Sequence, residues 1–425
     1  MKILIIQPYR LGDVLQTTPV LQALKMKYND VEIDFVVDSS CAGAIRGNPF
    51  VSRLIVLPRR SIQENGGKNA MAGFRELYAF MGEILQTRYD LAINYNFDSI
   101  GGIILKECMA LDKRGVIFRN GRIEMDDPWT KYLFAIISNR QYSLINITDI
   151  FRLMAGVQDF RAPLYLKAKA NKAVIKARFL DFPPGKKTVA LQGFASSMER
   201  SLSPVQNMEL IKKLTKKYNV VLIGGAGEER YMPGLKDDEN FRNLTGKTSL
   251  DELAGVIKNS DLLITPDTFA MHAGAAMGVR TLAMFKAGAW PFETAPYAAG
   301  VRIIYAPESC APCDKPGTCA NKRCGSGMTP QNIMLAAESV LGDAEGEAAA
   351  GVEILESKRD NFLYFDAGHL EKIIELISAN SLINSGKTPI IPVKRELRGA
   401  VRALTCGFRA LEADLKRDSV YTRAG

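Results

Sequence analysis

The sequence predicts an α/β protein with two doubly wound halves, and three observations lead to this fold class. Short apolar segments alternate with amphipathic segments over residues 1–120, and the same alternation returns from residue 189 on. A basic stretch that ends in Pro-Pro-Gly, 166–187, separates the two blocks. Apolar strands separated by helices indicate parallel sheets with helices on both faces. The chain of 425 residues is long enough for two such halves and an appendage.

In the first block, four apolar segments are expected to be strands. They are 2–7, 33–37, 54–57 and 91–95. The segments 14–28 and 74–86 have the apolar spacing of helices, and 121–165 is expected to be mainly helical. Because 166–187 has the composition of a linker, the first domain is expected to span 1–170 and the second 186–341.

The second block is expected to contribute five strands and helices between them. The strands are 189–193, the start of 220–229, 262–265, 281–285 and 301–306. Ser203, Pro204 and Gln206 form a capping-box signature, which predicts that a helix begins there. A further helix is expected at 249–260. Two such halves place a cleft between the carboxyl ends of their strands, where open α/β sheets bind ligands.

The charge balance indicates anionic partners. The chain has 55 Lys and Arg against 46 Asp and Glu, a formal charge of +9, which suits nucleotides or an anionic lipid surface. Nucleic acid is disfavoured, because basic runs interleaved with aromatic residues are absent. No apolar run approaches the roughly 20 residues of a transmembrane helix, and no signal peptide is evident, so a cytoplasmic location is expected.

Residues 342–425 are expected to form a linker and a helical extension. The final segment places an apolar stripe on one helix face, with basic residues over the rest. The stripe consists of Leu397, Val401, Leu404, Phe408, Leu411 and Leu415. Such a helix lies on an anionic membrane surface, here the inner face of the cytoplasmic membrane, or packs on the protein body.

The stretch 261–285 predicts an anion site. It combines a strand, the corner Pro266-Asp267-Thr268, a helix rich in small residues, and a second strand. Backbone N–H groups and the helix dipole favour an anion at such a corner, and His272 falls in the first turn of the helix. The alternatives are that Asp267 and Thr268 only cap the helix and that His272 is a core residue.

Two further motifs follow strands of the predicted sheets. Asp13, in Arg10-Leu11-Gly12-Asp13, is a helix N-cap or a general base that faces the cleft. Gly224-Gly225-Ala226-Gly227 lacks the third glycine of a dinucleotide fingerprint, because Arg230 stands there, so an NAD-dependent oxidoreductase is disfavoured. The next residues, Glu228 and Glu229, bind a ribose or form a solvated acidic turn.

Four cysteines lie close together near the end of the second block. They are Cys310, Cys313, Cys319 and Cys324. The first spacing suits a structural zinc site with four thiolates. The alternative is a set of reduced thiols, as expected in a cytoplasmic protein.

These motifs resemble glycosyltransferase family 9, the heptosyltransferase family, over about residues 1–340. The resemblance rests on RLGDVLQTTPVLQALK at the start and, later, on VVLIGGAGEE, the stretch from NLTGKTSLDEL to TLAMF and the cysteine loop. It implies a GT-B fold whose first half binds the acceptor and whose second half binds a nucleotide sugar such as ADP-heptose. It also implies inverting, metal-independent transfer to a glycolipid acceptor, the lipopolysaccharide core.

The resemblance also implies a role for individual residues. Asp13 matches the base that deprotonates the acceptor hydroxyl, and Arg10, Gly12, Thr17 and Thr18 lie on the acceptor side of the same motif. The residues that match the donor side of the family are Arg200, Glu228, Glu229, Asp267, Thr268 and His272. The sequence departs from the family pattern at Phe269, where a glycine is usual. That departure keeps a second hypothesis open, a catalytically inactive GT-B relative that binds nucleotide sugars or acts as a scaffold.

Overall fold

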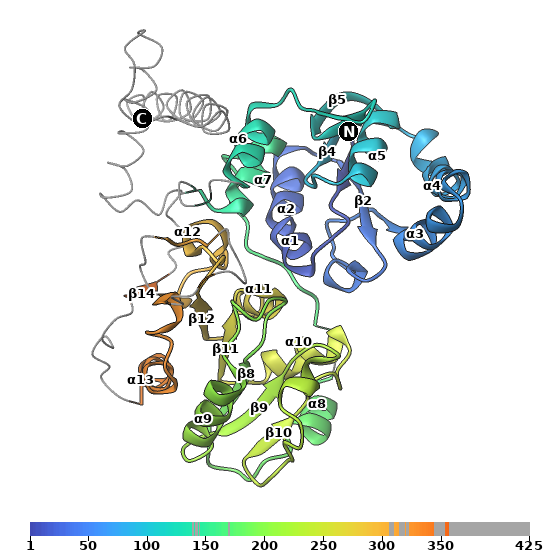
Figure 1. Ribbon diagram of the computed structural model, residues 1–425. Coiled ribbons are helices and arrows are strands. Elements are labelled where there is room, and N and C mark those ends of the chain that lie inside the picture. Colours follow the sequence, from blue (N-terminus) through green and yellow to red (C-terminus); the bar gives the residue numbers. More distant parts are fainter. Residues whose placement is uncertain are drawn as a thin grey trace, which may run out of the picture.

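The computed structural model (Figure 1) describes residues 1–137, 140, 143, 145–168, 171–305, 310–313, 319 and 323–343, and the backbone of 353–356. In these residues the chain forms two α/β halves, each built on its own sheet, which confirms the predicted fold class. The expected helices of the C-terminal extension lie outside the described residues. None of the described helices has the length and apolar composition needed to cross a bilayer.

The first half is built on a parallel sheet with the strand order β3-β2-β1-β4-β5 within the described chain. The strands are β1 (Lys2–Ile6), β2 (Glu32–Asp38), β3 (Arg53–Leu57), β4 (Arg88–Asn94) and β5 (Met109–Gly115). The first four match predicted strands. Residues Ile3 to Ile6 of the central strand β1 are fully buried, because helices cover both faces of the sheet (Figure 1).

Helices and one small hairpin complete the first half. The helices are α1 (Leu11–Gln16), α2 (Thr18–Lys27), α3 (Arg59–Lys68), α4 (Ala70–Leu85), α5 (Ser99–Glu107), α6 (Pro128–Ile137) and α7 (Ile147–Ala155), with a 3-10 turn at Ala42–Ala44. The predicted helix 14–28 is therefore two helices that meet at Thr17. Within 121–165, expected to be mainly helical, β7 (Arg122–Glu124) instead pairs with β6 (Ile117–Arg119).

The second half is built on a sheet with the order β10-β9-β8-β11-β12-β13-β14 in the described residues. The strands are β8 (Thr188–Gln192), β9 (Asn219–Ile223), β10 (Phe241–Asn243), β11 (Leu262–Pro266), β12 (Thr281–Phe285), β13 (Arg302–Tyr305) and β14 (Glu353–Glu356). All are parallel except β14, which is antiparallel to β13. All five predicted strands of this half are present.

The helices of the second half are α8 (Lys172–Phe179), α9 (Pro204–Leu214), α10 (Leu250–Lys258), α11 (Phe269–Ala276), α12 (Pro291–Thr294) and α13 (Pro330–Leu341), with 3-10 turns at Glu228–Tyr231 and Arg323–Gly325. Four of these helices, α8, α9, α10 and α13, begin at a residue whose side chain caps the helix. Ser203 and Gln206 form the predicted capping box of α9. The stretch expected to be a linker contains α8, whose Ile175 and Phe179 are buried in the core.

Apolar packing joins the two halves where α1 meets α11. Leu15 of α1 is buried in the same cluster as residues of the second half. Phe269, the first residue of α11, packs against this cluster and also against the main core of the first half. The two halves therefore share apolar contacts through α1 and α11.

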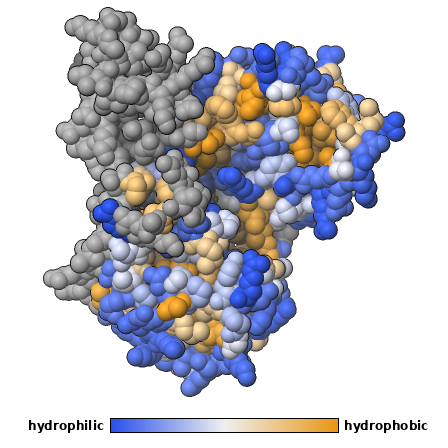
Figure 2. Space-filling model, viewed as in Figure 1, coloured by the Kyte–Doolittle hydropathy of each residue, from blue (hydrophilic) through white to orange (hydrophobic). Residues whose placement is uncertain are grey.

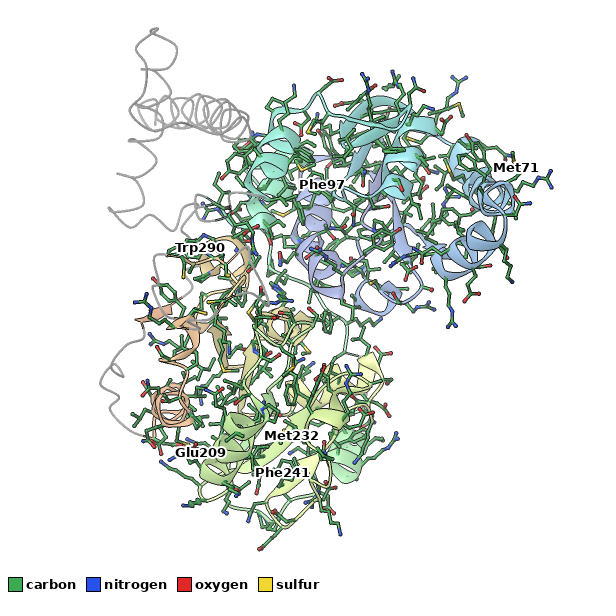
Figure 3. All side chains as sticks on the ribbon, in the orientation of Figure 1. Met71, Phe97, Glu209, Met232, Phe241 and Trp290 are labelled. Carbon is green, nitrogen blue, oxygen red and sulfur yellow. The ribbon has the colours of Figure 1, made fainter. Side chains whose placement is uncertain are left out.

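A second contact between the halves is polar and involves the segment around α12. The indole Nε1 of Trp290 donates to the carbonyl of Ser143 at 2.9 Å, and Asn146 donates to the carbonyl of Ala295 at 2.8 Å. Figure 3 shows Trp290 on the side of the second half that faces the first. The chain segment that follows β12 is therefore anchored to the first half.

The same contact contains a buried ionic network. Arg152 of α7 is fully buried, and its Nη1 donates to the carboxylate of Asp149 at 2.7 Å and to the hydroxyl of Tyr297 at 3.1 Å. The hydroxyl of Tyr297 donates to Asp149 at 2.8 Å. Each buried charge thus has a partner, as burial of ions requires.

Candidate active site

A cleft of about 1880 Å³ lies between the two halves. Its walls are the segments that follow β1 and β4 in the first half and β8, β9, β11 and β12 in the second. Figure 2 shows the waist between the two lobes, where hydrophobic residues reach the surface. The cleft is thus at the carboxyl ends of the strands of both sheets, as predicted.

Asp13 lines this cleft from the first turn of α1. The N-cap of α1 is Arg10, which has a positive φ of 62°, so Asp13 does not cap the helix and that alternative is wrong. Burial raises the pKa of Asp13 to about 6, and the nearby carboxylates of Asp267 and Glu293 add to this effect. Arg10, whose Nη1 lies 3.9 Å from Asp13 Oδ2, opposes it. A carboxylate with such a pKa is suited to general base catalysis near neutral pH.

The corner before α11 faces the same cleft. Thr268 is the N-cap of α11, but its side chain accepts no hydrogen bond from the helix. Its hydroxyl instead donates to Gln192 Oε1 at 2.8 Å and lies 3.0 Å from Thr265 Oγ1. Because no side chain caps α11, its N-terminus keeps the electrostatic preference for an anion.

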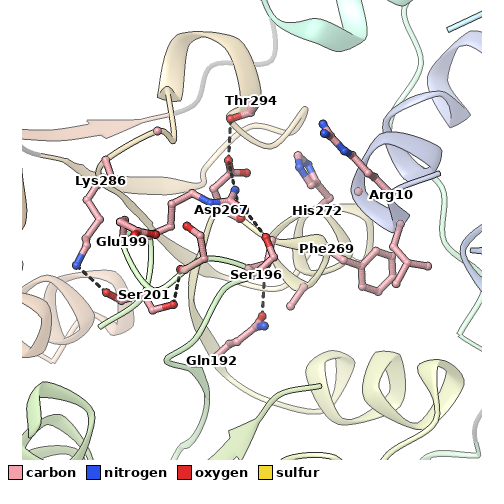
Figure 4. A pocket seen from close by; sticks show the side chains of 18 of the residues that line it. Arg10, Gln192, Ser196, Glu199, Ser201, Asp267, Phe269, His272, Lys286 and Thr294 are labelled. Atoms are coloured by element: carbon pink, nitrogen blue, oxygen red, sulfur yellow. Dashed lines mark hydrogen bonds and ion pairs between the residues drawn. The ribbon is translucent and has the colours of Figure 1, made fainter. Parts of the chain in front are cut away.

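Arg200 lies against this corner. Its Nη1 is 3.5 Å from Asp267 Oδ2, and its Nη2 donates to Ser196 Oγ at 2.5 Å. Figure 4 shows Asp267 turned toward Thr294, whose hydroxyl donates to its carboxylate at 3.3 Å. Burial raises the pKa of Asp267, while Arg200 and Arg140 lower it. The corner therefore combines a helix N-terminus with a cation.

His272 is buried where α11 meets α1. Its Nε2 lies 2.9 Å from Nε2 of Gln16, and its Nδ1 has no hydrogen-bond partner among the described residues. Burial lowers its pKa to about 3, so the imidazole is neutral at physiological pH. It can therefore contribute an N–H donor to an anion at this corner but no positive charge.

The structure separates the two candidate ribose ligands. Glu228 lines the cleft, and its Oε2 is buried without a partner in the described part of the chain. Its carboxylate lies over Gly224, where an added Cβ would be 2.5 Å from Oε2. Glu229 is not among the lining residues and accepts from the N–H of Gly227 at 2.7 Å. Of the two carboxylates, only that of Glu228 faces the cleft.

Of the four residues expected on the acceptor side, two line the cleft and two do not. Arg10 and Gly12 line the cleft, but Thr17 and Thr18 do not. Both threonines are fully buried, and their hydroxyls donate to the carbonyls of Val14 at 2.6 Å and Leu15 at 2.7 Å. Their expected place beside the acceptor is therefore wrong, because they satisfy the backbone where α1 ends and α2 begins.

The four cysteines all line the cleft, but they do not fit a metal centre. Among the residues that the structure describes, which include these four, no three ligand side chains are grouped closely enough to hold a metal ion. The expected tetrathiolate zinc site is therefore not formed by Cys310, Cys313, Cys319 and Cys324 in this arrangement.

Several lining residues were not expected from the sequence, and three of them are polar residues that meet at the contact of the halves or at the α11 corner. Arg140, Gln192 and Glu293 all face the cleft. Arg140 and Glu293 are 153 residues apart and form an ion pair across the two halves, with Nε and Oε2 2.5 Å apart. No local motif marks them, because only the packing of the halves brings them together.

The cleft thus contains both the carboxylate of Asp13 and the corner at the N-terminus of α11. Phe269, the first residue of α11, also lines the cleft, and Figure 4 shows its ring turned toward the helix that follows Arg10. Such an arrangement can deprotonate a hydroxyl on one side and stabilise a departing anion on the other.

Comparison with known proteins agrees with the family resemblance seen in the sequence. The family model described as glycosyltransferase family 9 (heptosyltransferase) matches residues 78–323. Lipooligosaccharide heptosyltransferase 2 of Campylobacter jejuni is 23% identical over 352 residues, which cover 80% of this chain and 98% of that protein.

Two solved structures share the fold. The glycosyl transferase family 9 protein from Veillonella parvula has a TM-score of 0.64 at 19% identity, over 81% of this chain and 98% of that one. The E. coli ADP-heptose lps heptosyltransferase II has a TM-score of 0.59 at 18% identity, over 80% of this chain and 98% of that one. These similarities identify the fold of the two halves as GT-B.

Proposed function

Since the chain belongs to glycosyltransferase family 9, and is therefore a glycosyltransferase, we propose that it transfers a heptose from ADP-heptose to the lipopolysaccharide core. The observation that carries the proposal is Asp13, a carboxylate of raised pKa, in the same cleft as the N-terminus of α11. The names of the similar proteins support the sugar, the nucleotide and the acceptor.

In the proposed reaction, Asp13 accepts the proton of an acceptor hydroxyl. The hydroxyl oxygen then forms a bond to the anomeric carbon, from the face opposite the leaving group. The bond between that carbon and the diphosphate oxygen breaks, so the nucleoside diphosphate leaves with the electron pair and the anomeric configuration inverts. The raised pKa favours this step, because a stronger base accepts the proton more readily while a large fraction remains ionised at neutral pH.

The leaving diphosphate gains negative charge, which the α11 corner is proposed to stabilise. Arg200 supplies a positive charge there, and the uncapped N-terminus of α11 supplies backbone N–H groups. Neutral His272 supplies an N–H donor in the same turn. We propose that these groups carry the charge in a metal-independent transfer.

The two halves are proposed to bind different substrates. The first domain, proposed as 1–170, holds a glycolipid acceptor beside Arg10 and Gly12. The second, 186–341, holds the nucleotide sugar, with Glu228 on the ribose. The proposed location is cytoplasmic, and contact with the inner membrane surface is a proposal for 342–425.

A catalytically inactive relative is the second candidate, and Phe269 in place of a glycine is the observation in its favour. The presence of Asp13 and the α11 corner in one cleft argues against it, because a scaffold has no use for a base of raised pKa.

The test is transfer by the Asp13→Asn variant. It is expected to lose turnover with ADP-heptose and a core glycolipid acceptor, while calorimetry shows nearly unchanged ADP binding, because the base is not needed to hold the donor. Asp159→Asn, at an exposed aspartate, is the matched control and is expected to behave like the wild type. Wild-type turnover of Asp13→Asn would contradict the assignment of the base.

A further inference from the structure

The reaction above gives no role to Arg140, a cation in the wall of the cleft. Arg140 lies between α6 and α7 of the first half, yet among the described residues both hydrogen bonds of its side chain go to the second half. Its Nε donates to Glu293 Oε2 at 2.5 Å, and its Nη1 donates to the carbonyl of Gly288. The side chain of Glu293 is only 7% exposed, whereas that of Arg140 is 28% exposed. The second half thus fixes a guanidinium that the first half supplies.

The remaining nitrogen of this guanidinium is available to a ligand. Nη2 of Arg140 has no hydrogen-bond partner in the described residues, and Arg140 lines the same cleft as Asp267 and Thr268. The positive charge of Arg140 also lowers the pKa of both Asp13 and Asp267. The guanidinium is therefore within electrostatic reach of the base and of the α11 corner.

We propose that Arg140 binds the diphosphate of the donor across the cleft and that Glu293 is the counter-ion that holds its guanidinium before the donor binds. This inference rests on the proposed function, which supplies a nucleoside diphosphate. A guanidinium has a planar fork of donors that matches phosphate oxygens, and Nη2 is the donor left for them. The departing diphosphate then meets Arg200 from one half and Arg140 from the other.

A structural role for the same ion pair makes a different prediction. If Arg140 and Glu293 only hold the halves together, removing either charge weakens the contact, and both substitutions change ligand binding in the same direction. If Arg140 binds the diphosphate through Nη2, then removing the negative charge of Glu293 removes its repulsion of the diphosphate and strengthens binding, whereas removing the charge of Arg140 weakens binding. The sign of the two effects separates the two roles.

The experiment is calorimetry on the full chain with ADP, UDP, GDP and CDP, followed by the monophosphate of the nucleotide that binds. Arg140→Gln is expected to weaken diphosphate binding by about tenfold or more, the loss of a charge-assisted hydrogen bond, and to leave monophosphate binding within about twofold. Glu293→Gln is expected to strengthen diphosphate binding. Arg46→Gln removes a charge from an exposed site outside the cleft and is the matched control.

Each outcome decides between the hypotheses. If the wild type binds none of the four diphosphates, the proposed function fails and this inference fails with it. If the wild type binds but Arg140→Gln binds equally well, or if the two variants change affinity in the same direction, only this inference is wrong. If Arg140→Gln does not fold, Arg140→Lys replaces it, because it keeps the positive charge without the planar guanidinium and is expected to weaken diphosphate binding. Glu293→Gln independently tests whether diphosphate binding becomes stronger.

Discussion

The acidic limb of the pH–rate profile is expected to follow the ionisation of Asp13 and to respond to Arg10. Activity requires the ionised base, so kcat/KM is expected to rise with pH through about 6 and to level off above it. Because Arg10 lowers the pKa of Asp13, replacing it by Met is expected to shift the limb to higher pH.

The size of the shift follows from the geometry. Two unit charges 3.9 Å apart interact by about 1 kcal/mol in water, which corresponds to about 0.7 of a pKa unit. The side chain of Arg10 is 83% exposed, and screening by dissolved salt reduces the effect to about half a unit. At pH 6 the ionised fraction of Asp13 then falls from about one half to about one quarter, while above pH 8 it is unchanged.

The assay is the pH dependence of kcat/KM from pH 5 to 9 for the wild type, Arg10→Met and Arg10→Lys. The Lys variant keeps the charge and is expected to retain the wild-type limb. A limb that stays in place in Arg10→Met would refute the electrostatic link between Arg10 and Asp13. If kcat/KM of Arg10→Met instead levels off at a lower value and the acidic limb stays at the same pH, Arg10 contacts a substrate.

Three further predictions concern single side chains. The pKa of His272 is lowered in the folded state, so on acidification the unfolded state binds the proton first. The free energy of unfolding is therefore expected to fall by about 2 kcal/mol between pH 6.5 and 5. Urea unfolding of His272→Gln at both pH values should lack this part of the loss. Gly224→Ala is expected to weaken donor binding, because the new Cβ would lie 2.5 Å from Glu228 Oε2. Calorimetry checks this, with Gly67→Ala as the control, because a Cβ added at Gly67 has no atom within 4 Å in the described structure. Phe269→Ala is expected to lose about 2 kcal/mol of stability, because the ring packs on both halves; an equal loss in Phe74→Ala, at an exposed position, would contradict that reason.

The strands could be predicted from the sequence where burial on both faces makes them apolar throughout. β1 and β11 are of this kind. The edge strand β5 (MALDKRG) was missed because it is mostly polar and partly exposed. α8 was taken for a linker because its helical pattern is short and its surface basic, so only packing against α10 shows that it belongs to the second half.

Some features of the candidate site could be predicted from the sequence as well, and others could not. Asp13 and the α11 corner could be located because each follows a recognisable strand at the carboxyl edge of a sheet. The roles of Arg140 and Glu293 could not be predicted, because their pairing depends on how the two halves pack. The neutral state of His272 likewise depends on its burial against α1, a tertiary effect that no local pattern specifies.

The anchoring of the α12 segment has a consequence for how products leave. Pulling Tyr297 away from Arg152 and Asp149 would strip a partner from buried charges, at a cost of several kcal/mol, whereas the contacts of Phe269 and Gln16 across the cleft carry no net charge. The α12 segment also packs on the second half, where Ala289 and Ala295 belong to the core and Thr294 donates to Asp267. The segment is thus bonded to both halves, so products that leave by separation of the halves would leave at the expense of buried charges or of part of the second core.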